Sequence, residues 1–260
     1  MNDAPLPFNR RLDEAMEKTG SLLCVGLDPR VALLEEPVED FCRRIIDATW
    51  EAAVAFKPNA AFFEALGLDG HQRLATVLGH CPPGRIMVLD AKRGDIGSTA
   101  EAYAHAAFGV LGADAVTVSP YLGGDSVAPF LADAAHGAFL LCHTSNPGAA
   151  DLQHLEIEGR PLYLHLAALA RGWNAQDNLG LVVGATYPEA LERVRAAAPE
   201  LPFLVPGIGA QGGDLEASVR AGLDALGRGL LISSSREIIF AADPRAAALR
   251  TRDAIDRARG

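Results

Sequence analysis

Eight short apolar runs, each followed by a segment with helical spacing, constrain the fold of this chain more than any other feature. Such alternation is typical of a parallel sheet whose strands are joined by helices. The runs are almost continuously hydrophobic, which predicts strands that are buried on both faces. They begin at Ser21, Ala53, Arg85, Asp114, Gly137, Leu179, Pro202 and Asp224.

Eight such units in one unbroken series favour a closed (β/α)8 barrel, the TIM-barrel member of the α/β class, over a doubly wound open sheet. No linker rich in Pro, Gly or Ser divides the series, so we expect residues 1–260 to form a single domain. The expected helices begin at Val38, Ser98, Pro161, Pro188 and Leu215. The one long connection covers residues 146–160, after the fifth run.

The charge and the apolar pattern exclude several classes of partner. The formal net charge of -10 argues against nucleic acid or an anionic membrane surface, because both are polyanions. No run approaches the length of a membrane span, and the first residues have no apolar signal-peptide core. The 4 cysteines are scattered and form no CxxC pair, so we expect a protein of the reducing cytoplasm.

Polar residues gather where the apolar runs end. Enzymes built on such barrels carry their active sites at the carboxyl ends of the strands. We therefore expect the candidate site residues among these positions: Asp28, Lys57, Asn59, Asp90, Lys92, Thr144, Ser145 and Pro206.

Asp90 and Lys92 stand two positions apart on the third run, so both side chains should leave the strand on the same face. A structural ion pair closing the top of the barrel would explain these two residues alone. Lys57, from the neighbouring strand end, turns the pair into an array of two cations around one anion. Buried charge is costly unless it is paired, so such an array indicates a functional site.

Asp95 follows the array at the start of the next predicted helix. Ser98 and Glu101 have the spacing of a capping box, which makes Ser98 the expected N-cap. Asp95 is then free for a role in the site.

Glycine-rich turns near the last two runs indicate a phosphate site. The segment PGIGAQGGD begins at Pro206, and Gly227 and Arg228 stand in the sequence GRG. Barrels often bind phosphate through backbone amides in this region, and the guanidinium of Arg228 and the amide of Gln211 could add hydrogen bonds. The GxGxxG pattern within the first turn does not follow the first strand of an open sheet, so we do not expect a dinucleotide site. The histidines show no HxxH or HExxH spacing, and we expect no metal site.

The segment DAKRGDIGST, from Asp90 to Thr99, resembles the DxKxxDI signature of the orotidine 5'-phosphate decarboxylase family. Other motifs typical of that family follow the same order along nearly the whole chain. These motifs are GLD at Asp28, FKPN at Lys57, TSNPG at Ser145, PGIGAQGGD at Pro206 and GRG at Arg228. The segments after the fifth run resemble the longer bacterial branch of the family.

The resemblance implies conversion of orotidine 5'-monophosphate to uridine 5'-monophosphate and carbon dioxide, a step of pyrimidine biosynthesis, without cofactor or metal and in a homodimer. It implies that Lys92 stabilises and protonates C6, and that Asp90 lies against the departing carboxylate. Lys57 and Asp95 would orient this pair, with Asp95 reaching into the site of the partner subunit.

The same resemblance implies the contacts to the nucleotide. Asp28 and the Thr99 of a partner chain would bind ribose hydroxyls, and Ser145 would read the amide edge of the pyrimidine. Gln211 and Arg228 would bind the phosphate. The predicted substrate site therefore comprises Asp28, Thr99, Ser145, Pro206, Gln211, Gly227 and Arg228.

Two other functions are compatible with parts of this pattern. A magnesium-dependent sugar-phosphate decarboxylase or aldolase would share the barrel and the DxKxxD spacing, but would use carboxylates at strand ends as metal ligands. A nucleotide-binding barrel without activity would not need the complete Lys, Asp, Lys array.

Overall fold

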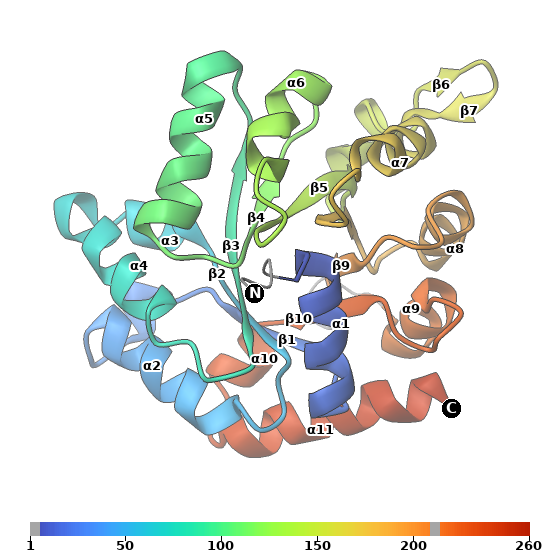
Figure 1. The fold of residues 1–260 in the computed structure, drawn as a ribbon. Coiled ribbons are helices and arrows are strands. Elements are labelled where there is room, and N and C mark those ends of the chain that lie inside the picture. The colour runs from blue at the N-terminus through green and yellow to red at the C-terminus, as the bar shows by residue number, and fades with distance from the viewer. Residues whose placement is uncertain (1–5, 209–213) are drawn as a thin grey trace, which may run out of the picture.

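In the computed structural model, which describes residues 6–208 and 214–260, parallel strands close into a barrel (Figure 1). The order around it is β1-β10-β9-β8-β5-β4-β3-β2. The (β/α)8 barrel predicted from the sequence is confirmed. The barrel strands are β1 (Leu23–Leu27), β2 (Ala55–Pro58), β3 (Ile86–Arg93), β4 (Ala115–Val118), β5 (Gly137–His143), β8 (Leu179–Val183), β9 (Phe203–Pro206) and β10 (Leu230–Ser234).

Helices surround the barrel, as Figure 1 shows. Their buried positions are apolar and pack in one core with the strands. In α2 (Val38–Thr49), for example, the buried positions Phe41, Cys42, Ile45 and Ile46 repeat at helical spacing. The other outer helices are α3 (Ala60–Glu64), α4 (Gly70–Leu78), α5 (Gly97–His105), α6 (Gly124–Val127), α7 (Leu162–Trp173), α8 (Pro188–Ala197), α9 (Leu215–Gly222), α10 (Arg236–Ile239) and α11 (Pro244–Arg259).

The eighth predicted run was placed too early in the chain, because β10 begins only at Leu230. The residues before it form a turn instead. The carboxylate of Asp224 accepts hydrogen bonds from the backbone N–H groups of Leu226 and Arg228, each at 2.9 Å. Gly227 and Gly229 have φ values of 70° and 79°, a left-handed conformation that favours glycine and does not fit a strand.

Helix α1 (Phe8–Thr19) lies inside the ring of outer helices in Figure 1 and covers the amino-terminal end of the barrel. The ring of Phe8 packs so closely on Gly137, the first residue of β5, that a Cβ there would lie 2.2 Å from it. The amide of Asn9 donates to the carbonyl oxygen of Leu179, the first residue of β8, at 3.2 Å. Since this end is filled, a substrate must enter from the carboxyl ends of the strands.

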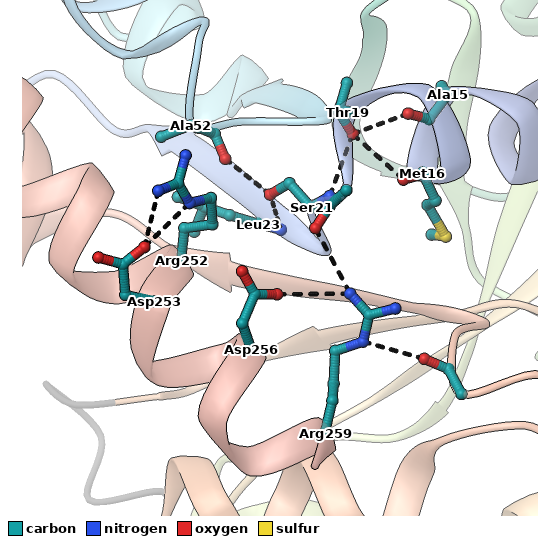
Figure 2. A network of polar contacts seen from close by, with 12 residues as sticks. Ala15, Met16, Thr19, Ser21, Leu23, Ala52, Arg252, Asp253, Asp256 and Arg259 are labelled. Atoms are coloured by element: carbon teal, nitrogen blue, oxygen red, sulfur yellow. Dashed lines mark hydrogen bonds and ion pairs between the residues drawn. The ribbon is translucent and has the colours of Figure 1, made fainter.

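A polar network joins the two ends of the chain near the start of β1 (Figure 2). The hydroxyl of Ser21 donates to the carbonyl oxygen of Ala52 at 2.6 Å. Arg259, at the end of α11, donates to the carbonyl oxygens of Gly20 at 3.4 Å and Gly227 at 3.1 Å. These contacts hold α11 against the turns before β1 and β10.

The long connection after β5 contains a short 3-10 helix, η5 (Pro147–Asp151), and a small hairpin. Strands β6 (Glu156–Ile157) and β7 (Arg160–Pro161) pair antiparallel and project away from the barrel at the upper right of Figure 1. Among the described residues, no helix is long and apolar enough to cross a membrane.

Candidate active site

A cavity of about 500 Å³ opens at the carboxyl ends of the strands, and each barrel strand or the loop directly after it contributes to its wall. All eight residues predicted at the strand ends line it: Asp28, Lys57, Asn59, Asp90, Lys92, Thr144, Ser145 and Pro206. These polar strand ends therefore meet in one mouth, as the sequence predicted.

The carboxylate of Asp90 lies between the two lysines. Lys57 Nζ donates to Asp90 Oδ2 at 2.9 Å, and Lys92 Nζ donates to Asp90 Oδ1 at 2.6 Å. The side chain of Lys57 is 6% exposed and that of Lys92 is 52% exposed. Lys57 is thus a buried counter-ion, whereas Lys92 presents its ammonium group to the cavity.

Asp90 and Lys57 keep their charges at neutral pH. Burial alone would raise the pKa of Asp90, but the ammonium groups of Lys57 and Lys92 outweigh it and hold the pKa well below its usual range. Burial alone would lower the pKa of Lys57, but the carboxylates of Asp90 and Asp28 outweigh that effect and raise it. The wall of the cavity therefore holds the charged carboxylate of Asp90 beside the charged ammonium group of Lys57.

Strand β3 is irregular between Asp90 and Lys92. Its register against β4 shifts between Leu89 and Arg93, and Lys92 has a φ of 47°. A left-handed conformation is uncommon for a residue with a side chain. The two side chains converge as expected, but through a bulge and not through the regular alternation of a strand.

Ser145 lies in a close approach between two strand ends. A Cβ added to Gly184, directly after β8, would lie 2.7 Å from the backbone nitrogen of Ser145. Next to it, Gln153 accepts a hydrogen bond from the backbone N–H of Thr144 and donates to the Thr144 hydroxyl, both at 2.8 Å. The long connection thus folds back to hold the end of β5 and places Gln153 in the cavity wall.

The ends of β9 and β10 complete the wall. Pro206 and Ser233 are paired in register, and Ser233, Ser235 and Arg236 all line the cavity. Arg236 is the first residue of α10 and is exposed. Its guanidinium group is suited to bind a phosphate at this edge.

Comparison with known proteins identifies the family. The model of the "Orotidine 5'-phosphate decarboxylase / HUMPS family" matches residues 21–251. The chain belongs to this family. It is 50% identical over 267 residues to orotidine 5'-phosphate decarboxylase of Roseiflexus castenholzii, covering 96% of this chain and 98% of the relative. It is 51% identical over 267 residues to the Azoarcus sp. (strain BH72) protein of the same name, with the same coverage of 96% and 98%.

Solved structures of the family have the same fold. Leishmania donovani OMP decarboxylase superimposes with a TM-score of 0.92 at 50% identity, covering 98% of this chain and 99% of that one. Leishmania donovani UMP synthase gives a TM-score of 0.94 at 52% identity and 98% coverage of this chain. This chain spans only 57% of the UMP synthase chain.

The structure does not place two of the residues predicted to bind the phosphate, Arg228 and Gly227, in the cavity wall. Arg228 and Gly227 precede β10 and so lie at the amino-terminal end of the barrel, away from the cavity. The guanidinium group of Arg228 makes a two-pronged ion pair with Asp13 of α1, with Nε at 2.6 Å and Nη2 at 2.8 Å from the two carboxylate oxygens. The error came from the misplaced eighth strand.

Arg236 was missed for the same reason, although the sequence contains its signal. The run Leu230–Ile232 is apolar and is followed by three serines and Arg236, which is the pattern of a strand with a polar carboxyl end. Gln211, the other predicted phosphate ligand, lies outside the described residues.

Asp95 and Thr99 do not line the cavity of their own chain. Asp95 accepts a hydrogen bond from the backbone N–H of Ile96 at 2.8 Å, and Thr99 is exposed. The predicted capping box is not formed, because α5 begins at Gly97, one residue before Ser98, with Ile96 in the N-cap position. Asp95 therefore lies partly exposed in the β3–α5 connection, and Thr99 is exposed in the first turn of α5.

The histidines form pairs at most with other groups that can bind a metal, among the residues that the structure describes. Among residues 6–208 and 214–260, no group of three or more His, Cys, Asp or Glu side chains is placed to hold a metal ion. His143, at the end of β5, pairs with His154 through their Nε2 atoms at 2.9 Å.

Proposed function

We propose that this chain decarboxylates orotidine 5'-monophosphate to uridine 5'-monophosphate and carbon dioxide, as the names of its relatives indicate. The observation that carries the proposal is the carboxylate of Asp90 held between Lys57 and Lys92 in the wall of the cavity. The reaction leaves an electron pair on C6 of the pyrimidine. Cations and a proton donor are the groups that such a carbanion requires.

Lys92 is the group that we assign to the chemistry. The bond between C6 and the carboxylate breaks, carbon dioxide leaves, and the electron pair stays on C6. The ammonium group of Lys92 stabilises this pair and transfers a proton to it, and the resulting amine regains its proton from water. Lys57 keeps Asp90 charged and in place throughout, because it is buried and bound to the opposite oxygen.

The carboxylate of Asp90 raises the energy of the bound substrate, because it faces the carboxylate group of the substrate. Two like charges about 4 Å apart repel by roughly 4 kcal/mol at an effective dielectric constant of about 20. Relief of that repulsion is worth about three decades of rate, which is too little for so unstable a carbanion. The remainder must come from Lys92 and from binding energy of the distant ribose and phosphate groups.

The cavity offers polar groups for those distant parts. Asp28 Oδ1 is buried and has no hydrogen-bond partner among the described residues, which suits it to accept from a ribose hydroxyl. We assign the phosphate to Arg236, together with Gln211, and the pyrimidine amide edge to Ser145. Pro206 forms the adjoining wall.

We further propose a homodimer in which Asp95 and Thr99 enter the site of the partner subunit. Asp95 is partly exposed in the connection after β3, and Thr99 is exposed in the first turn of α5. Large apolar side chains are exposed beside them: Ile96 is 56% exposed, and Tyr121 and Leu122, after the neighbouring strand β4, are 81% and 48% exposed. An apolar patch of this kind favours burial against a second copy.

Two further proposals concern the chain as a whole. We infer that it forms one domain, because its first and last barrel strands, β1 and β10, are hydrogen-bonded neighbours. We also infer that it works in the cytoplasm, since all four cysteine thiols are free.

The test is the loss of absorbance when the purified protein receives orotidine 5'-monophosphate, with and without a chelator. We expect turnover that the chelator does not change, because the proposed chemistry uses side chains only. The Asp90→Asn variant is the matched control and should be inactive. Turnover that disappears with the chelator, or activity only on sugar phosphates with added magnesium, would contradict the proposal and favour the metal-dependent alternative.

A further inference from the structure

Thr117, the third residue of β4, lies against the bulge that separates Asp90 from Lys92. It is 1% exposed, and its hydroxyl makes three hydrogen bonds to β3. It donates to Asp90 Oδ1 at 3.0 Å, and it accepts from the backbone N–H groups of Ala91 at 3.0 Å and Lys92 at 2.9 Å. A hydroxyl has one hydrogen and two lone pairs, so these contacts use its full capacity.

The two backbone contacts explain how the bulge is held. In a regular parallel pair, alternate N–H groups of β3 would bond to carbonyl oxygens of β4, but the register shift removes that arrangement here. Buried N–H groups without acceptors are costly. The hydroxyl of Thr117 supplies the acceptor for both Ala91 and Lys92, and so stabilises the left-handed backbone of Lys92.

The third contact concerns the charge array. Asp90 Oδ1 receives hydrogen bonds from both Thr117 and Lys92, while Oδ2 is held by Lys57. Of the three groups that donate to Asp90, Thr117 is the uncharged one, and it lies on the buried strand β4. Its hydrogen bond therefore sets the rotation of the carboxylate even when Lys92 leaves Asp90 to reach a substrate.

We propose that Thr117 is a positioning residue for the decarboxylation, because one hydroxyl fixes both the carboxylate of Asp90 and the backbone that carries Lys92. This inference rests on the proposed function of the cavity. Thr117 acts through these two residues and takes no part in proton transfer. Displacement of reacting groups by about 1 Å is enough to lower a rate by about a hundredfold.

The first test compares Thr117→Val, which keeps the shape and removes the hydroxyl, with Thr117→Ser, which keeps the hydroxyl. We expect kcat to fall about 100-fold in the Val variant with KM within about threefold of wild type, and to recover to within about fivefold in the Ser variant. Thr49→Val is the matched control, because Thr49 is also 1% exposed and donates within α2 at 2.7 Å. It should leave kcat unchanged.

The second test needs no turnover and separates a failure of this inference from a failure of the proposed function. Amide hydrogen exchange of Ala91 and Lys92 should be at least about tenfold faster in Thr117→Val than in wild type and in Thr117→Ser. If the Val variant does not fold, Thr117→Ala lacks the same hydroxyl and takes its place. Unchanged exchange at both amides, or a kcat in the Val variant within threefold of wild type, would overturn the inference.

Discussion

Arg228 and Arg236 lie at opposite ends of strand β10, Arg228 bound to Asp13 at the amino-terminal end of the barrel and Arg236 in the cavity wall at the carboxyl end. Of these two arginines, Arg236 is therefore the one that can reach a nucleotide in the cavity. The two arginines form a natural pair for testing where the phosphate binds.

Arg236→Ala should lower kcat/KM about 100- to 1,000-fold, because a guanidinium–phosphate contact is lost. This corresponds to a loss of a few kcal/mol of transition-state stabilisation. Arg228→Ala is the control and should leave kcat/KM within about threefold while lowering the melting temperature, since Asp13 loses its partner. The same two variants assayed on the nucleoside without phosphate should not differ from wild type. Loss of phosphate recognition in the Arg228 variant alone would show that the assignment is wrong.

Lys92→Ala should abolish turnover, by at least about a thousandfold, because it removes both the cation and the proton donor at C6. Calorimetry should still detect binding of uridine 5'-monophosphate, since the ribose and phosphate contacts remain. Arg93→Ala is the matched control: this neighbouring cation pairs with Glu64 at 2.7 Å and does not line the cavity. A Lys92 variant that retained a tenth of wild-type turnover would exclude the proposed role.

The parts of this site that were predictable from sequence are those set by local pattern. Asp28, Lys57, Asp90 and Lys92 each end an apolar run, and the closure of the barrel brings such ends together. The barrel itself follows from the alternation of apolar runs and helices. These features depend on residues close together in the chain.

The errors and omissions depend on contacts between distant residues. The turn at Asp224 contains Ala and Leu and resembles the start of a strand until Asp224 is seen to bind the N–H groups of the residues after it. The bulge after Asp90 requires the hydroxyl of Thr117, 25 positions beyond Lys92. Helix α5 begins at Gly97 with Ile96 as its N-cap, and the capping pattern at Ser98 did not reveal this start.

Mixing two inactive variants should test the shared site. If Asp95 completes the site of a partner, Asp95→Asn and Lys92→Ala chains should regain activity when they are refolded together. One site of the mixed dimer then has both Lys92 and Asp95, and the other has neither. Random exchange makes about half of the dimers mixed, so recovery should approach roughly a quarter of wild-type activity. Sedimentation would confirm the dimer, and no recovery at any mixing ratio would contradict a site that is shared through Asp95.

Gly184→Ala should weaken substrate binding by displacing Ser145. The added Cβ would lie 2.7 Å from the Ser145 backbone nitrogen and 2.9 Å from its Cα, so the strand end must move. We expect KM to rise about tenfold, with the fold retained. Gly172→Ala is the matched control, because a Cβ at this position on α7 meets nothing within 4 Å. Equal KM values for the two variants would show that Ser145 does not read the substrate.

The buried His143 should make the folded protein sensitive to mild acid. Its ring faces His154 at 2.9 Å and the rings of Tyr163 and Tyr187, and its Nδ1 is buried without a hydrogen-bond partner among the described residues. Burial and, to a smaller degree, His154 lower the pKa of His143 from 6.5 to about 4, against a weak opposing effect of Glu189.

Because the pKa of His143 is lower in the folded state, the unfolded chain binds more protons between about pH 6.5 and pH 4, and the free energy of unfolding falls as the pH drops through that window. Between pH 7 and pH 5 the loss from this group should be about 2 kcal/mol, measured by urea unfolding at each pH. His143→Gln should remove that part of the pH dependence, while His71→Gln, a change at an exposed position of α4, should keep it. A His143 variant with the wild-type difference between pH 7 and pH 5 would mean that the acid sensitivity arises elsewhere.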